Sequence, residues 1–143
     1  MLLHIRGHHL PGRVWQGRDE HYDNVHVGIQ LGKEPHELVP GDAKSAAWTI
    51  PIDIVDREDG RDFRGPAVQG RRGERFVYLT WGDVGDDGSF AMFRRAKLIL
   101  ADLEPFVGNT ESVIARVDLT DERGGPQCAR LRPPALELEP AAD

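Results

Sequence analysis

The chain has 143 residues and a formal net charge of -6, so it is long enough to bury a core and lacks the overall basic charge of a nucleic-acid-binding protein. Its single cysteine excludes an internal disulfide, and no apolar run is long enough for a signal peptide or a membrane span. We therefore expect one cytoplasmic domain over residues 1–143, with a polar C-terminal tail and with no nucleic-acid and no membrane partner.

The first half of the chain contains three stretches in which apolar and polar residues alternate with the period of a β-strand. They are Leu2–Arg6, Val25–Leu31 and Trp48–Ile54. The third stretch contains Pro51, which has no N–H to donate to a ladder, so this strand is expected at a sheet edge or at a bulge. A long connection with turn signals is expected between the second and third strands.

The stretch from Phe63 to Gly82 is the one around which we expect the fold to be organised. It predicts a hairpin of two strands, Phe63–Val68 and Arg75–Trp81, joined by the glycine-bracketed turn Gly70–Gly73. Both alternating sets of residues in the second strand are largely apolar, which is typical of a strand covered on both faces. That strand should therefore be central in its sheet.

The C-terminal part of the chain combines a helical pattern with further strands. Apolar residues recur at helical spacing over about residues 90–103, so one α-helix is expected there. Strands are expected at Val113–Leu119, Gln127–Arg132 and Leu136–Leu138. The 16 glycines and 10 prolines indicate many turns. The whole pattern predicts a mainly β fold, an antiparallel sandwich or partly open barrel with one packed α-helix.

Basic residues on the turn and on the expected helix, together with aromatic residues of the central strand, form a predicted ligand-binding surface. A glycine-bracketed turn that presents arginines can bind a carboxylate or a phosphate through bidentate hydrogen bonds. The alternative interpretation is a set of solvated charges on a turn and on the wet face of a helix. The residues of this surface are Arg71, Arg72, Arg75, Tyr78, Trp81, Arg94 and Arg95.

The sequence contains no clear motif for a metal site or for a catalytic nucleophile, so we expect no metal and no cofactor. The five histidines near the start of the chain lack a short ligand spacing, and the acidic turns at 53–59 and 83–87 lack the spacing of a calcium loop. Cys128 has no histidine near it in sequence and is interpreted as a small structural residue. Those five histidines are His4, His8, His9, His21 and His26.

From Phe63 to Gly82 the chain reads F-R-G-P-x-V-x-G-x-x-G-E-R-F-x-Y-L-x-W-G, and in this signature it resembles an uncharacterised bacterial family of domains of unknown function. The stretches Met92–Leu98 and Cys128–Pro134 add to the resemblance. It implies a compact stand-alone domain, and it carries over no catalytic or binding residue.

Two functional hypotheses follow from these observations. The first is a small-molecule- or protein-binding β domain of unknown specificity, without intrinsic catalysis. The alternative is a cofactor-free barrel enzyme of the cyclase or isomerase type, acting on a small hydrophobic substrate with Tyr78, His4 and His26 as acid or base. A cavity of roughly 300 Å³ or more lined by those three residues would favour the enzyme. An exposed edge strand would also allow a homodimer.

Overall fold

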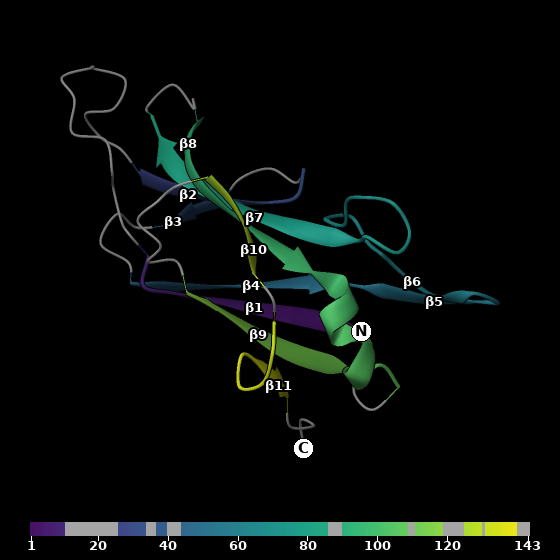
Figure 1. The fold of residues 1–143 in the computed structure, drawn as a ribbon. Helices are drawn as coiled ribbons and strands as arrows, with labels where there is room; N and C mark the ends of the chain where they lie inside the picture. The colour runs from purple at the N-terminus through teal and green to yellow at the C-terminus, as the bar shows by residue number, and fades with distance from the viewer. Residues whose placement is uncertain are drawn as a thin grey trace.

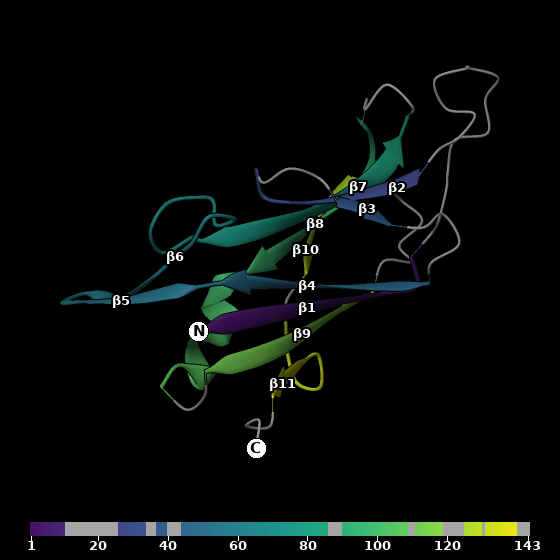
Figure 2. The same ribbon diagram turned by 180° about the vertical axis from the view of Figure 1, so that it is seen from behind.

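A computed structural model describes residues 1–10, 26–33, 37–39, 44–85, 90–108, 111–118, 125–129 and 131–139, and at residues 26–27, 90–94 and 125–129 it describes the backbone. Within these ranges the chain forms two larger sheets, a two-stranded ribbon and one short helix (Figures 1 and 2). None of the sheets closes into a barrel. In these ranges the fold is therefore mainly β, as predicted, and includes one helix.

The strands are arranged as follows. The four-stranded sheet has the order β11 (Leu136–Leu138), β9 (Ser112–Asp118), β1 (Leu2–His8) and β4 (Ser45–Pro51). The five-stranded sheet has the order β10 (Gly125–Ala129), β8 (Phe90–Ile99), β7 (Phe76–Val84), β2 (His26–Leu31) and β3 (Glu37–Val39). The ribbon pairs β5 (Asp53–Arg57) with β6 (Gly60–Arg64), and the helix is the 3₁₀ helix η2 (Leu100–Phe106).

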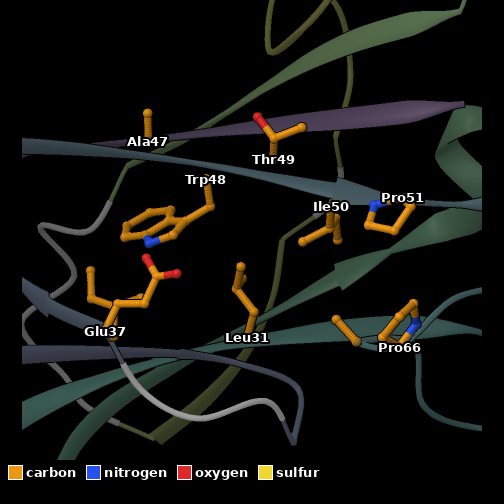
Figure 3. Close-up of a pocket in the computed structure, with 10 residues that line it drawn as sticks. Leu31, Glu37, Ala47, Trp48, Thr49, Ile50, Pro51 and Pro66 are labelled. Atoms are coloured by element: carbon orange, nitrogen blue, oxygen red, sulfur yellow. The ribbon is translucent and has the colours of Figure 1, made fainter.

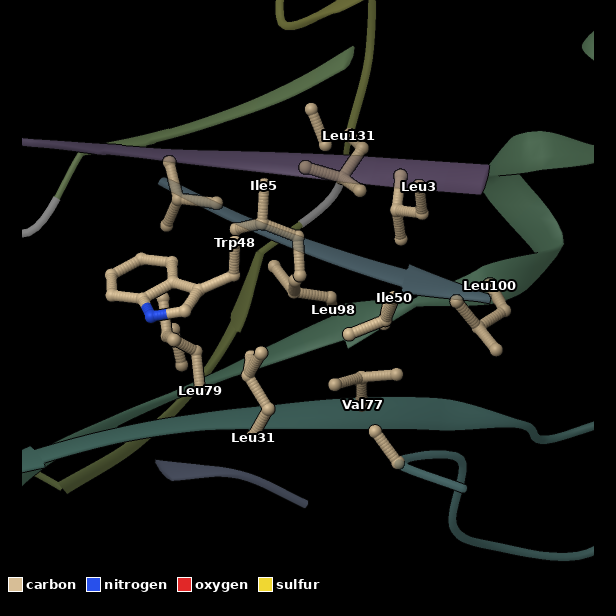
Figure 4. Close-up of a cluster of buried hydrophobic side chains, with 14 of the residues drawn as sticks. Leu3, Ile5, Leu31, Trp48, Ile50, Val77, Leu79, Leu98, Leu100 and Leu131 are labelled. Atoms are coloured by element: carbon tan, nitrogen blue, oxygen red, sulfur yellow. The ribbon is translucent and has the colours of Figure 1, made fainter. Parts of the chain in front are cut away.

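The inner faces of the two larger sheets supply one hydrophobic core. Figure 4 shows side chains of β1 and β4 pointing toward side chains of β7 and β8. The alternation read from the sequence accounts for this arrangement, because every second residue of a strand points to the same face. Leu3 and Ile5 of β1 and Val77, Leu79 and Leu98 of the opposite sheet have no exposed surface.

Strand β7 is central, as predicted, since it lies between β8 and β2 in the five-stranded sheet. The predicted hairpin is wrong in its first strand, because Phe63–Val68 does not form a strand beside β7. Residues 65–68 form a turn in which the Val68 N–H donates to the Gly65 carbonyl over 3.1 Å, because Pro66 has no N–H for a ladder. Phe63 instead belongs to β6, and the isolated bridge between Gln69 and Phe76 is what remains of the expected pairing.

The predicted α-helix over about residues 90–103 is also wrong in type and position. Residues 90–99 form strand β8, which pairs antiparallel with β7 and parallel with β10. The ladder with β7 outweighs the helical spacing of the apolar residues, because tertiary pairing overrides a weak local preference. The helix that does form, η2, begins at Leu100, whose N–H donates to the carbonyl of Arg75 over 3.1 Å.

Strand β4 lies at the edge of its sheet, as the proline predicted. The expected strand Trp48–Ile54 is divided at Ile52 into β4 and β5, and β3 lies within what was expected to be a long connection. The other expected strands correspond to β1, β2, β9, β10 and β11. Two pairings, β1 with β9 and β8 with β10, are parallel, so the sheets are mixed rather than purely antiparallel.

Candidate functional site

A cleft with a volume of about 630 Å³ lies between β4, at the edge of the four-stranded sheet, and the β2–β3 pair of the other sheet. Figure 3 shows its lining. The walls come from β2, from Glu37 of β3, from five consecutive residues of β4 (47–51) and from the turn residues Pro66 and Ala67. The cleft therefore lies where the two sheets present neighbouring edges to each other.

The walls of the cleft are largely apolar. Trp48 and Ile50 point from β4 toward Leu31 on β2, while Ala47 and Thr49 point to the opposite face of β4 (Figure 3). Trp48 and Ile50 are each 7% exposed, so they belong to the core and to the cleft wall together. An apolar ligand that entered the cleft would exclude water from these side chains.

One end of the cleft is lined by Pro66 and Ala67, which belong to the turn over residues 65–68. A Cβ atom added to Gly65 would lie 2.5 Å from the Pro51 carbonyl oxygen, and one added to Gly32 would lie 2.4 Å from the Ala67 carbonyl oxygen. The turn is therefore in backbone contact with the end of β4 on one side and with the end of β2 on the other. Gly32 also has a φ of +58°, which favours glycine.

Glu37 is the titratable side chain that the described cleft lining contains. It is exposed, it faces Trp48 in Figure 3, and it has no ion pair among the described residues. The sequence does contain a signal for this site: an edge strand with large apolar residues on its inner face leaves an apolar wall beside an unpaired backbone edge. Glu37 itself lies in a segment that the sequence pattern assigned to a connection.

His4, a candidate acid or base, does not line the cleft. Its Nδ1 lies 2.8 Å from the Thr49 hydroxyl, and its Nε2 lies 2.7 Å from a carboxylate oxygen of Glu139. Because Thr49 points away from the cleft, this group occupies the outer face of the four-stranded sheet. Its observed contacts join β1 and β4 to the segment that follows β11.

The three arginines of the predicted anion site contact carboxylates of the same chain. Each guanidinium forms an ion pair with an acidic residue of its own turn or of the neighbouring ribbon, and Arg75 also donates to the Gly70 carbonyl. Two of these contacts connect the turn 70–75 to the ribbon, one to the turn between β5 and β6 and one to β6 itself. The pairs are Arg71 with Glu74, Arg72 with Asp59 and Arg75 with Asp62.

Asp62 is the buried member of these pairs. Its side chain has no exposed surface, Arg75 Nε donates to it over 2.9 Å and Arg64 Nε over 3.0 Å. The hydrogen bond from Arg75, assisted by that from Arg64, lowers the pKa of Asp62 from 3.8 to about 2, against the opposite effect of burial. The carboxylate is therefore ionised at neutral pH and holds both arginines.

The structure brings together two other predicted residues, Tyr78 and Arg95, on the outer face of the five-stranded sheet. The Arg95 guanidinium lies 4.4 Å from the centre of the Tyr78 ring, and Lys97 Nζ lies 4.3 Å from the centre of the Phe76 ring. The two rings meet edge to face at 4.7 Å. Cations stacked on aromatic faces cover this side of β7.

Trp81 lies on the other face of β7, in the core, and is 3% exposed. Arg94 pairs with it across the β7–β8 ladder through the backbone, and the side chain of Arg94 lies outside the described residues. The predicted residues whose side chains are described thus occupy several places: the turn that contacts the ribbon, the outer face of the five-stranded sheet and the core.

Among the described residues, no group of three or more His, Cys, Asp or Glu side chains is placed to hold a metal ion. Residues 86–87 of the second acidic turn and the side chain of Cys128 lie outside the described residues. In the part of the chain that is described, no helix is long and apolar enough to cross a membrane. Of the early histidines, His4, His8 and His9 are described, whereas His21 and the side chain of His26 are not.

Comparison with known proteins gives a family and no function. No curated protein and no solved structure matches the chain. The sequence model of one family of unknown function covers residues 1–141, which is nearly the whole chain and includes the cleft and the signature from Phe63 to Gly82. The chain therefore belongs to the family of unknown function DUF5990.

Proposed function

We propose that this domain is a binding module without intrinsic catalysis, and that its ligand occupies the cleft between β4 and the β2–β3 pair. The observation that carries the proposal is the cleft itself: its volume of about 630 Å³ falls within the range of ligand sites, and its walls are mainly apolar with one carboxylate. Such a lining suits a largely apolar ligand, either a small molecule or a segment of a protein.

The arrangement supports binding better than the alternative of a cyclase or isomerase. General acid–base catalysis needs a titratable side chain within hydrogen-bond reach of the proton that it transfers. Tyr78 and His4 belong to the outer faces of the two sheets, and neither is part of the described cleft lining. In the described part of the cleft lining Glu37 is the titratable side chain, and because its carboxylate is exposed we assign it to recognition rather than to proton transfer.

The neutral apolar dye Nile red tests the proposal. We expect its fluorescence to rise on binding to the wild-type protein, because the cleft walls remove the dye from water. The variant Leu31→Phe places a larger side chain in the cleft and should weaken this binding. Leu38→Phe is the matched control, since Leu38 lies on the adjacent strand, is 58% exposed and does not line the cleft.

Melting curves of both variants are needed beside the titrations, because an enlarged side chain in a packed wall can cost about 1–3 kcal/mol. The proposal predicts that folded Leu31→Phe loses dye binding while Leu38→Phe keeps it. Equal binding by the wild type and by both folded variants would place the dye elsewhere and contradict the proposal, as would an absence of binding to the wild type.

A further inference from the structure

The hydrogen bonds between β1 and β4 show which backbone groups of β4 face the cleft. Met1 and Ile52 exchange two hydrogen bonds: the Met1 amino group donates to the Ile52 carbonyl over 3.1 Å, and the Ile52 N–H donates to the Met1 carbonyl over 2.8 Å. In an antiparallel pair such residues alternate with residues whose backbone groups point away from the partner. Leu2 follows this rule, since its N–H donates over 2.7 Å to Glu111 on the other side of β1.

Counting back from Ile52 into β4, the residues whose backbone N–H and C=O groups face β1 are Ile50 and Trp48. The backbone N–H and C=O groups of Thr49 and Ala47 therefore point to the opposite edge of the strand. Because β4 is the last strand of its sheet, no described strand pairs with this edge. Pro51, the next residue in the series, has no N–H, and Gly65 lies against its carbonyl.

The lining of the cleft agrees with this geometry. Residues 47 to 51 all line it, although alternate side chains of a strand point to opposite faces. Consecutive residues line a cavity together when the edge of the strand, with its backbone groups, faces the cavity. The cleft thus offers a row of hydrogen-bond donors and acceptors beside the apolar side chains of Trp48 and Ile50.

The opposite wall adds a charge to this row. Glu37 carries an exposed carboxylate that has no ion pair among the described residues. A ligand that supplied a basic side chain near this position would gain a complementary charge and a more specific register.

We propose, on the basis of the cleft-binding function above, that the ligand is an extended peptide that adds to the free edge of β4. It becomes a fifth strand of the four-stranded sheet, directs alternate apolar side chains toward Trp48 and Ile50, and places a lysine or arginine at Glu37. Strand addition of this kind derives affinity from backbone hydrogen bonds and specificity from the pockets for alternate side chains.

An array of acetylated hexapeptide amides, each with alternating apolar residues and one lysine at a varied position, tests the inference by displacement of Nile red. We expect a subset of the array to displace the dye. Glu37→Gln should weaken these peptides by roughly tenfold, and should leave matched peptides with glutamine in place of lysine unaffected, because only the charge pair is lost.

Two changes to the backbone test strand addition itself. Ala47→Pro removes an N–H that β1 does not use, so it should weaken peptide binding by roughly tenfold, whereas the control Ala47→Val keeps the N–H. In case Ala47→Pro does not fold, N-methylation of a binding peptide at alternate residues gives the same information on the wild-type protein. Methyl groups on one alternate set should abolish binding, and those on the other set should be tolerated.

The outcomes separate this inference from the proposed function. If Nile red binds the cleft and no peptide displaces it, the peptide inference is wrong and a small-molecule ligand remains. If neither binds, the proposed function fails as well. If the wild type is a dimer in solution and Ala47→Pro is a monomer, the edge pairs with a second copy of the chain, which overturns the peptide inference.

Discussion

Asp62 is a residue whose ionisation is strongly changed by folding. Its carboxylate has no exposed surface and is held by Arg75 and Arg64, which lower its pKa to about 2. A carboxyl group whose pKa is lower in the folded protein than in the unfolded chain stabilises the fold at any pH above its ordinary value of 3.8. That stabilisation is lost as the pH falls through the range between the two values.

We therefore predict that the free energy of unfolding of the wild type decreases as the pH is lowered from about 4 to about 2. The variant Asp62→Asn should be less stable at neutral pH and should lose less over this interval, because it has no carboxyl group to protonate. Urea unfolding at a series of pH values measures both quantities. Asp56→Asn is the control, since that carboxylate is 82% exposed. Equal pH slopes for wild type and Asp62→Asn would refute the role of this pair.

Trp81 tests the central position of β7 at the level of one side chain. It is 3% exposed and lies between β2 and β8, so truncation leaves a large cavity that the neighbouring strands cannot fill. Trp81→Ala should lower the free energy of unfolding by roughly 3–5 kcal/mol. Leu38→Ala, at a 58% exposed position, should change it by less than about 0.5 kcal/mol. An unchanged melting curve for Trp81→Ala would contradict the observed placement of the strand.

At the scale of elements, the turn over residues 65–67 connects the two sheets at the end of the cleft. Gly32 and Gly73 both have a left-handed backbone, with φ values of +58° and +88°. A Cβ at Gly32 would lie 2.4 Å from the Ala67 carbonyl oxygen, whereas a Cβ at Gly73 would meet no atom within 4 Å. A substitution at either glycine causes backbone strain, but of the two only Gly32 would also bring a Cβ into steric conflict. Comparing the two variants therefore distinguishes the cost of strain from the cost of the close contact.

We predict that Gly73→Ala costs about 1–2 kcal/mol through strain alone. Gly32→Ala should lower the free energy of unfolding by roughly 1–3 kcal/mol more than Gly73→Ala does, because the turn must move away from the end of β2. It should also weaken binding in the cleft, since Pro66 and Ala67 line it. Denaturant unfolding and Nile red titration of the two variants measure these effects. Equal destabilisation by both would mean that the contact with Ala67 is not maintained in solution.

The segments 63–68 and 90–99 show where local sequence is insufficient at this scale. The first segment was predicted as a strand, yet it turns at Pro66, and the second was predicted as part of an α-helix, yet it forms strand β8. In each case the outcome depends on backbone partners. Strand β8 has a neighbour on each side, whereas residues 65–68 have one turn hydrogen bond and no ladder.

At the scale of the whole molecule, the sheets and the ribbon differ in how well their backbone is protected. Strand β7 has neighbours on both sides, whereas the ribbon of β5 and β6 is a separate two-stranded sheet that projects beyond the others in Figures 1 and 2. Isolated two-stranded ribbons are marginally stable in water, and exposed ion pairs such as Arg61 with Glu104 add little.

We predict that native-state hydrogen exchange follows this division. The amides of β7 that pair with both neighbours should exchange only through global unfolding, and those at the ribbon tip, Arg57 to Gly60, should have little protection. Exchange measured by mass spectrometry on peptic fragments distinguishes the two regions. Similar protection across the ribbon tip and β7 would contradict the division.

The sequence by itself determined the mainly β class and the central position of β7, and it limited the strand that contains Pro51 to a sheet edge or a bulge. These features follow from local chemistry: the side-chain period of two, apolar residues on both faces of one strand, and the missing N–H of Pro51. Only the tertiary structure decided that residues 90–99 form a strand, that Arg75 binds Asp62, and that β4 faces β2 and β3 across a cleft. Those outcomes depend on which distant backbone groups and charges meet when the sheets pack, and no local pattern encodes these distances.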